Sequence, residues 1–191
     1  MKNKEKVYRE ILYQTIERKN RTLTQSELSK KLKISLSTVN HALSYLKEMN
    51  AIKINPRNFN VIDPKKILLY WASIRNLKKD IIFKTRIDEP IGKIEGNMPD
   101  DIVYGGYSAY KFKFEDVPAD YSEIYIYGAE LKRFKENEKN PNLFLIKKDG
   151  EEGYGKTTTI AQTFVDLWNL KEWYANDFIK ALEEKIGGIL E

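Results

Sequence analysis

Small polar side chains near residue 40 have the chemistry needed to read the edges of DNA bases. Between Lys33 and Ile54 the chain carries six of them, which are Ser35, Ser37, Thr38, Asn40, His41 and Ser44. Serine and threonine hydroxyls donate and accept hydrogen bonds, and an asparagine amide can pair with both N6 and N7 of adenine. The sequence therefore predicts a surface whose uncharged groups lie in or near base edges in the major groove.

Residues suited to the phosphate backbone follow this polar run. They are Lys47, Lys53, Arg57 and Asn58. Contacts to phosphate fix the position of a protein on a duplex, whereas contacts to base edges select its sequence. We therefore expect these four residues to contact the DNA backbone.

The polar run must be carried by a helix that is buried on its other side. Val39, Leu43 and Leu46 recur at the spacing i, i+4 and i+7, which predicts a helix from about Leu36 to Met49. Ser35 and Ser37 lie near its start, and their side-chain oxygens can accept hydrogen bonds from the N–H groups of the first turn. An ordinary solvated helix would show the same pattern, so the neighbouring segments decide the interpretation.

A shorter helix is predicted just upstream. Thr24 and Glu27 have the spacing of a capping box at the start of the segment TQSELSKKL, in which Leu28 and Leu32 face inward. A tight turn over residues 31–35 then joins the two helices. This arrangement matches a helix-turn-helix, whose second helix enters the groove.

A hairpin is predicted after the second helix. Apolar residues alternate from Ala51 to Ile54 and again from Phe59 to Ile62, and the intervening NPRN favours a turn. Arg57 at the tip could touch the backbone or the minor groove, as a wing does. With a first helix over Lys2 to Asn20, residues 1–62 are predicted to form a winged helix-turn-helix DNA-binding domain.

Charge is divided unevenly along the 191 residues. Residues 1–80 hold 18 Lys and Arg against 7 Asp and Glu, a balance of +11, whereas residues 81–191 hold 15 against 21, a balance of −6. A basic half suits binding to double-stranded DNA, and an acidic half should face away from phosphates or toward a basic partner. The DNA chemistry is therefore expected in the first half.

Cysteine is absent, which excludes a disulfide framework and cysteine chemistry. The N-terminus lacks the apolar stretch of a signal peptide, and no run of apolar residues is long enough to cross a membrane. We expect a cytoplasmic protein without membrane contact.

The second half is predicted to be a mixed α/β domain over residues 81–191, which makes the whole chain α+β. A connecting helix over residues 63–80, opened by Asp63 and Pro64, would either join the halves or form the contact of a homodimer. Strands are predicted at 81–87, 111–115, 123–127 and 143–146, and helices at 129–138, after 157–159 and at the C-terminus. The wholly apolar strand 143–146 should be central and buried.

One motif suggests a nucleotide-binding enzyme instead. The segment GEEGYGKT at residues 150–157 has the P-loop spacing G-x-x-x-x-G-K-[ST], in which backbone N–H groups and the lysine surround phosphates. However, Glu151 and Glu152 would place negative charge among the phosphates, and no later strand is predicted that could supply a second magnesium ligand. We therefore expect an ordinary surface connection.

The other reactive side chains do not assemble a catalytic set. His41 is the only histidine, which argues against a Ser-His-Asp hydrolase or a multi-histidine metal site. The acid pairs Asp100–Asp101 and Glu115–Asp116 are expected to be solvated turns. The expectation is a protein that is not an enzyme and uses no cofactor or metal.

The chain resembles the AbiEi-type antitoxins of type IV toxin–antitoxin systems. The resemblance rests on the N-terminal winged helix, the segments GGYSAYKFKF and DYSEIYIYG, and TIAQTFVDLWNL followed by a final helix. It implies a C-terminal domain similar to an inactive nucleotidyltransferase. It also implies that the protein represses its own operon at inverted repeats and opposes a cognate nucleotidyltransferase-like toxin.

The residues agree with a loss of nucleotidyltransferase activity. Members of that superfamily that are active carry Gly-Ser, followed by a strand with two acids one residue apart for magnesium. Here Gly106 and Ser108 are separated by Tyr107, and the later strand reads Glu123-Ile124-Tyr125. Two-metal catalysis needs the missing carboxylate. A nucleotide-binding or nucleotidyltransferase enzyme with an appended winged helix is the alternative.

Overall fold

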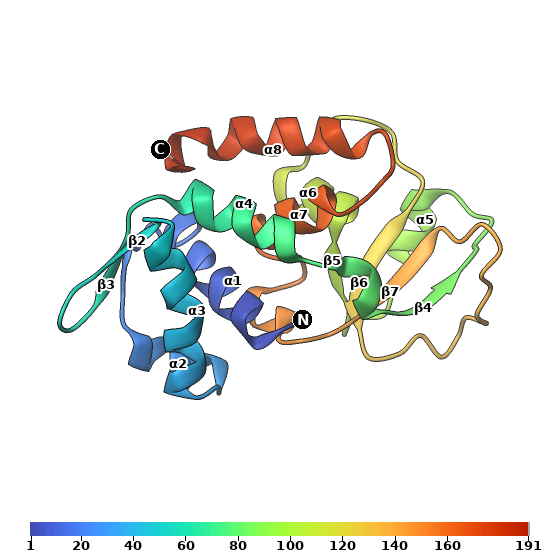
Figure 1. Cartoon of the computed structure of the whole chain (residues 1–191). Coiled ribbons are helices and arrows are strands. Elements are labelled where there is room, and N and C mark those ends of the chain that lie inside the picture. The colour runs from blue at the N-terminus through green and yellow to red at the C-terminus, as the bar shows by residue number, and fades with distance from the viewer. Residues whose placement is uncertain (191) are drawn as a thin grey trace. The chain divides into compact units, whose positions relative to one another are not determined.

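The computed structural model describes residues 1–190, apart from the side chains of Glu152, Ile189 and Leu190. The chain divides into two compact units. The first comprises residues 1–75 together with the end of the chain from residue 183, and the second comprises residues 76–182. Figure 1 labels the elements of both units, and each unit is described by itself.

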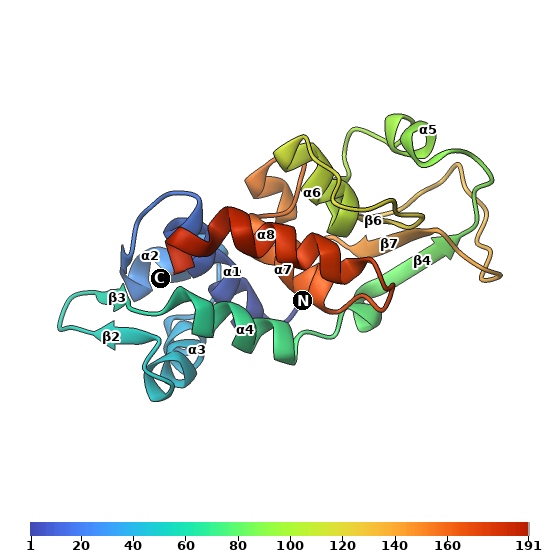
Figure 2. The same ribbon diagram turned by 90° about the horizontal axis from the view of Figure 1, so that it is seen from above.

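The first unit has the element order of a winged helix. Its elements are α1 (Asn3–Ile16), β1 (Thr22–Leu23), α2 (Gln25–Leu32), α3 (Leu36–Glu48), β2 (Ile52–Ile54), β3 (Phe59–Val61) and α4 (Pro64–Ile74). Strands β1 and β2 both pair antiparallel with β3, giving a sheet in the order β1-β3-β2. Figure 2 shows the turn between β2 and β3 projecting away from α1, α2 and α3. The predicted helices and hairpin of this unit are present, but two helices are shorter than predicted: α1 ends at Ile16 and not at Asn20, and α4 ends at Ile74 and does not continue to residue 80.

Local capping interactions set where α2 and α3 begin. The Thr24 hydroxyl accepts the backbone N–H of Glu27 at 3.1 Å, and the Glu27 carboxylate accepts the N–H of Thr24 at 3.2 Å, which completes the predicted capping box. Helix α2 ends at Lys33, whose left-handed conformation (φ 53°) reverses the chain. Ser35 then caps α3. The tight turn of the helix-turn-helix follows from these three local features.

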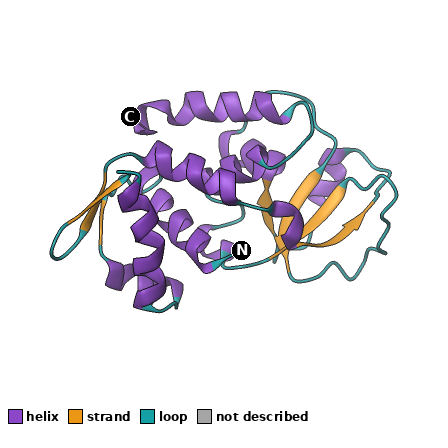
Figure 3. Cartoon of the chain, viewed as in Figure 1, coloured by secondary structure: helices purple, strands orange, loops and turns teal. Residues whose placement is uncertain are grey.

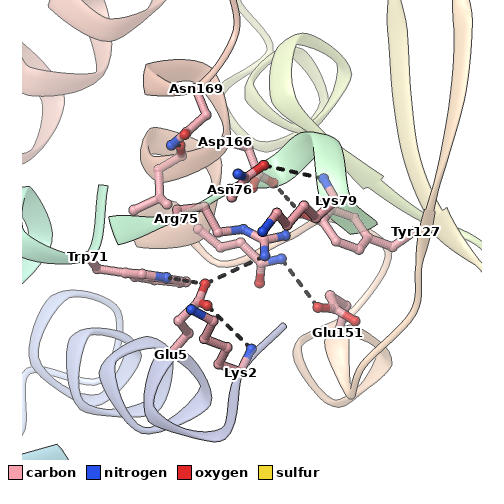
Figure 4. Close-up of polar contacts among 12 residues, drawn as sticks. Lys2, Glu5, Trp71, Arg75, Asn76, Lys79, Tyr127, Glu151, Asp166 and Asn169 are labelled. Carbon is pink, nitrogen blue, oxygen red and sulfur yellow. Dashed lines mark hydrogen bonds and ion pairs between the residues drawn. The ribbon is translucent and has the colours of Figure 1, made fainter. Parts of the chain in front are cut away.

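Helix α4 packs in the first unit through a buried polar contact with α1. The Glu5 carboxylate accepts hydrogen bonds from the Trp71 indole N–H at 3.3 Å and from the Arg75 guanidinium at 3.5 Å (Figure 4). Glu5 and Arg75 are both buried. A buried carboxylate is tolerated because these donors replace the water that it loses. The contact therefore fixes α4 against α1.

The second unit is built on a four-stranded sheet in the order β4-β7-β6-β5. Its strands are β4 (Ile81–Thr85), β5 (Val103–Gly105), β6 (Ile124–Gly128) and β7 (Leu143–Lys147). Strands β6 and β7 are parallel, and the other pairs are antiparallel. Its helices are α5 (Ile91–Gly96), α6 (Gly106–Phe114), α7 (Ile160–Trp168) and the start of α8 (Ala175–Leu190), with short 3-10 turns at Leu77–Asp80 and Glu151–Tyr154. The central place of β7 is confirmed.

The two faces of this sheet differ in chemistry. Ile124 and Leu145 belong to an aliphatic face that is closed by Ile94 of α5. The opposite face carries aromatic side chains, and the Tyr127 hydroxyl donates to Asp166 of α7 at 2.7 Å (Figure 4). This alternation follows from the period of two along a strand.

The predicted strand at 111–115 is wrong, because these residues continue α6. Tyr107, Tyr110 and Phe114 recur at i, i+3 and i+7, and the first two are fully buried. This helical spacing outweighs a short alternation of lysine and phenylalanine. The helix starts directly after β5, at Gly106, whose positive φ of 50° explains the glycine there.

The helix predicted at 129–138 is also wrong. The segment between β6 and β7 is a loop (Figure 3). Of its apolar residues, Leu131 is buried and Phe134 is half-buried, too few for an amphipathic stripe. Its backbone bonds to β4 instead, since the Lys135 carbonyl accepts the Thr85 hydroxyl at 2.8 Å. Hydrogen bonds to β4, which is distant in sequence, therefore take the place of the hydrogen bonds that a helix would form.

We predict that Glu5→Ala lowers the free energy of unfolding by about 3 kcal/mol, because it leaves a buried guanidinium and an indole N–H without this acceptor. Urea denaturation followed by circular dichroism measures the change. The matched control is Glu48→Ala, an exposed glutamate of α3, which should change stability by less than about 0.5 kcal/mol. Equal changes in both variants would contradict a stabilising role for the Glu5 contacts.

Candidate DNA-binding surface

Helix α3 presents its polar residues outward because its apolar stripe is buried. Val39, Leu43 and Leu46 are fully buried in the first unit. On the other side Ser37, Asn40, His41 and Lys47 are exposed. The structure thus brings four of the predicted DNA contacts onto one exposed helix surface, which we call the α3 surface.

Three other predicted base contacts bond within the chain. The Ser35 hydroxyl accepts the backbone N–H of Thr38 at 3.1 Å, and the two hydroxyls lie 2.8 Å apart. The half-buried Ser44 donates its hydroxyl to the His41 carbonyl at 2.8 Å. These side chains lie beside the α3 surface, and part of their hydrogen-bonding capacity is used to hold the helix.

A row of aromatic side chains orients His41. The Tyr45 hydroxyl lies 3.3 Å from Nε2 of His41, and the two rings meet edge to face at 5.2 Å. Tyr45 in turn stacks on Tyr70 of α4, with centroids 6.2 Å apart, and Lys4 lies 5.3 Å from the Tyr45 ring. The imidazole is therefore supported from a helix outside the helix-turn-helix.

The hairpin between β2 and β3 carries three of the four predicted backbone contacts, Lys53, Arg57 and Asn58. Lys53 and Arg57 are exposed. Asn58 is half-buried and closes the turn, because its carbonyl accepts the N–H of Asn55 at 2.8 Å and its side-chain oxygen accepts the Asn55 amide at 2.8 Å. Asn58 thus shapes the wing, and the cationic side chains of Lys53 and Arg57 are exposed to solvent on it.

Two exposed residues beside the α3 surface were not predicted as DNA contacts. Lys33 lies in the turn before α3, and its charge within the predicted turn at 31–35 was a usable signal. Leu36 opens α3 and is 52% exposed. Its spacing from Val39 and Leu43 is that of a core residue, so the pattern alone could not show its exposure.

The P-loop-like segment does not have the geometry of a phosphate site. Glu151 is fully buried, and its carboxylate accepts the Asp149 N–H and the Gln162 amide. Helix α7 begins at Ile160, beyond the Gly-Lys-Thr residues that open the helix in a P-loop. The Lys156 ammonium lies beside Asp100, 3.5 Å from its carboxylate. The carboxylate of Glu151 thus lies inside the loop that would have to bind phosphate.

The second unit has a cavity of about 740 Å³ on the aromatic face of its sheet, beside β7. Tyr125 and Phe144 form a stacked pair in its lining, with centroids 4.7 Å apart. Acidic and basic lining residues are equal in number, namely Glu123, Glu136, Glu138 and Glu172 against Lys78, Lys84, Arg86 and Lys171. The lining has no excess of positive charge that would attract a triphosphate.

Tyr125 of β6 stands two residues after Glu123, at the position where the resemblance to nucleotidyltransferases would place a second acid. Burial raises the pKa of Tyr125, and its protonated hydroxyl donates to Glu172 at 3.4 Å. Burial also raises the pKa of Glu123, and the nearby Glu172 adds to this effect. The Glu172 carboxylate therefore accepts hydrogen bonds from two tyrosine hydroxyls, those of Tyr107 and Tyr125.

Comparison with known proteins supports the description of the first unit. A family model for winged helix-turn-helix DNA-binding matches residues 9–53, from within α1 to within β2. No curated protein and no solved structure matches the chain. Within residues 1–190, no helix combines the length and the apolar character needed to cross a membrane. The N-terminal part is a winged helix-turn-helix DNA-binding domain.

Because Ser35 caps α3, we predict that Ser35→Ala lowers the free energy of unfolding by about 1 kcal/mol. The control is Ser37→Ala, two residues on, which removes an exposed hydroxyl beyond the cap position and should change stability by less than about 0.5 kcal/mol. Urea denaturation of both variants provides the comparison. A larger loss in Ser37→Ala would mean that the cap is assigned to the wrong serine.

Proposed function

We propose that this chain, whose N-terminal part is a winged helix-turn-helix DNA-binding domain, is a sequence-specific transcriptional regulator that acts in the cytoplasm. The α3 surface supports this most directly. Its exposed residues Ser37, Asn40 and His41 offer hydrogen-bonding groups, and the cations Lys33 and Lys47 lie before and after them. Uncharged donors and acceptors suit base edges, and cations suit phosphates.

In the proposed complex, α3 lies in the major groove and the wing lies along the backbone. Asn40 pairs with an adenine, and Ser37 and His41 contact neighbouring bases. Lys47, Lys53 and Arg57 bind phosphates. Four further residues hold these groups in place or lie close to the DNA, namely Ser35, Thr38, Ser44 and Asn58. The balance of +11 over residues 1–80 supports this orientation.

At a finer level we propose an autorepressing antitoxin of a type IV toxin–antitoxin system. The resemblance of the chain to AbiEi-type antitoxins supports this role, and it implies a nucleotidyltransferase-like toxin as partner. A homodimer on inverted repeats would place two copies of α3 about one helical turn of DNA apart. A gel-shift assay on the DNA upstream of the protein's own gene tests autorepression directly.

We also propose that the second unit is not an enzyme. The buried Glu151 in the P-loop-like segment and the tyrosine at position 125 support this proposal. Titration with ATP or GTP in the presence of magnesium should show no binding at micromolar concentrations. Micromolar affinity that is lost in Lys156→Ala would contradict the proposal, and so would metal-dependent nucleotide transfer.

For Asn40→Ala we predict a loss of about 1–3 kcal/mol in binding to a specific site and little change on random DNA. Fluorescence anisotropy on both DNAs at one salt concentration measures the two affinities. Asn176→Ala, which removes an exposed asparagine from the second unit, is the matched control and should bind normally. Equal losses on both DNAs would show that Asn40 does not read a base.

Arg57→Ala should weaken binding to all DNA similarly, because a phosphate contact carries no sequence information. The plot of log affinity against log salt concentration should become shallower by about one unit. The control is Arg86→Ala, an exposed arginine of the second unit that pairs with Asp88 at 2.8 Å. An unchanged slope in Arg57→Ala would remove the wing from the proposed contact.

A further inference from the structure

Leu36 is an apolar side chain at the place where α3 would enter a groove. It is the first residue of the helix, and it is 52% exposed. Val39 and Leu43, which lie three and seven residues later, are fully buried. The first turn of α3 therefore extends beyond the core that the rest of its stripe fills, and Leu36 leaves about half of its surface exposed to solvent.

The neighbour of Leu36 on the helix surface is Asn40. Residues four apart on an α-helix lie one above the other on the same side, so these two side chains are adjacent. Both are exposed. The α3 surface thus joins an apolar group to the amide that is proposed to pair with adenine. Ser35 and Ser37, on either side of Leu36 in sequence, are exposed and polar.

The major groove offers one apolar group to such a side chain. Thymine carries a methyl at C5, whereas cytosine has hydrogen there and the purines carry no methyl group. A leucine set against polar base edges would remove their water without replacing its hydrogen bonds, which costs free energy. Contact with a thymine methyl buries two apolar surfaces instead.

We propose that Leu36 is a specificity-determining residue that contacts the C5 methyl of a thymine beside the adenine read by Asn40. This inference rests on the proposed function and adds one base preference to it. Leu36 discriminates thymine from cytosine and from uracil, which pairs as thymine does but lacks the methyl. A 5-methylcytosine at the same position restores the apolar contact.

The test begins with selection of a binding site from a random DNA library by the full chain. Each thymine of that site is then replaced singly by uracil, which removes one methyl and leaves base pairing intact. Burial of one methyl contributes about 0.8 kcal/mol, which is about fourfold in affinity. We expect such a loss at a thymine next to the adenine that is sensitive to Asn40→Ala.

Two variants separate the contact from general effects. In Leu36→Ala the affinity loss caused by uracil should become much smaller than in the unchanged protein. Leu36→Met keeps apolar volume and should retain most of the preference for thymine. The control is Ile62→Ala, which removes another apolar side chain of similar exposure, 51%, from the same unit and should leave the uracil penalty intact.

The possible results separate the Leu36 contact from the proposed function. If a site is selected and Asn40→Ala weakens it, but no uracil substitution matters, the Leu36 contact is overturned and the regulator proposal stands. The Leu36 contact is also overturned if Leu36→Ala keeps the full uracil penalty. If the library yields no preferred sequence, both proposals are overturned. A cytosine at the sensitive position should regain affinity when it is methylated at C5.

Discussion

Burial of one apolar stripe on α3 is the constraint on which the rest of the DNA-binding domain depends. Val39, Leu43 and Leu46 are fully buried in a unit in which α1 packs against both α3 and α4. Because an α-helix has a fixed period, burying these three residues turns Ser37, Asn40 and His41 outward. The cap at Ser35 and the reversal at Lys33 then set where the helix begins. One side of α3 thus packs in the core, and the opposite side exposes its polar residues.

The second unit is organised by a different contrast, between an aliphatic and an aromatic face of one sheet. Aliphatic side chains of β6 and β7 form a closed core with Ile94 and Leu131. On the other face, hydroxyls of buried tyrosines donate to acidic residues, as Tyr127 does to Asp166. Such bonds help acidic residues to lie inside a fold, because a hydroxyl group replaces part of the water that a buried carboxylate loses. They explain how an acidic unit can be well packed while offering little to a polyanion.

Features set by neighbouring residues could be predicted from the sequence, and features set by distant contacts could not. The capping box of Thr24, the cap of α4 by Asp63 and the NPRN turn are local, and all are present. The loop at 129–142 depends on bonds to β4, which no local pattern reveals. In the candidate site, the polar residues of α3 were predictable by type. The exposure of Leu36 depends on where the core ends, and spacing does not encode that.

The aromatic row that ends at His41 has a consequence for how this domain can evolve. Tyr70 belongs to α4, and Tyr45 transmits its position to the imidazole. Helix α4 is itself fixed by the Glu5 carboxylate. A substitution in α4 that moves Tyr70 would therefore shift the imidazole, while every residue of the helix-turn-helix stays the same. If His41 contacts a base as proposed, mutations in a scaffold helix provide a route to new binding preferences.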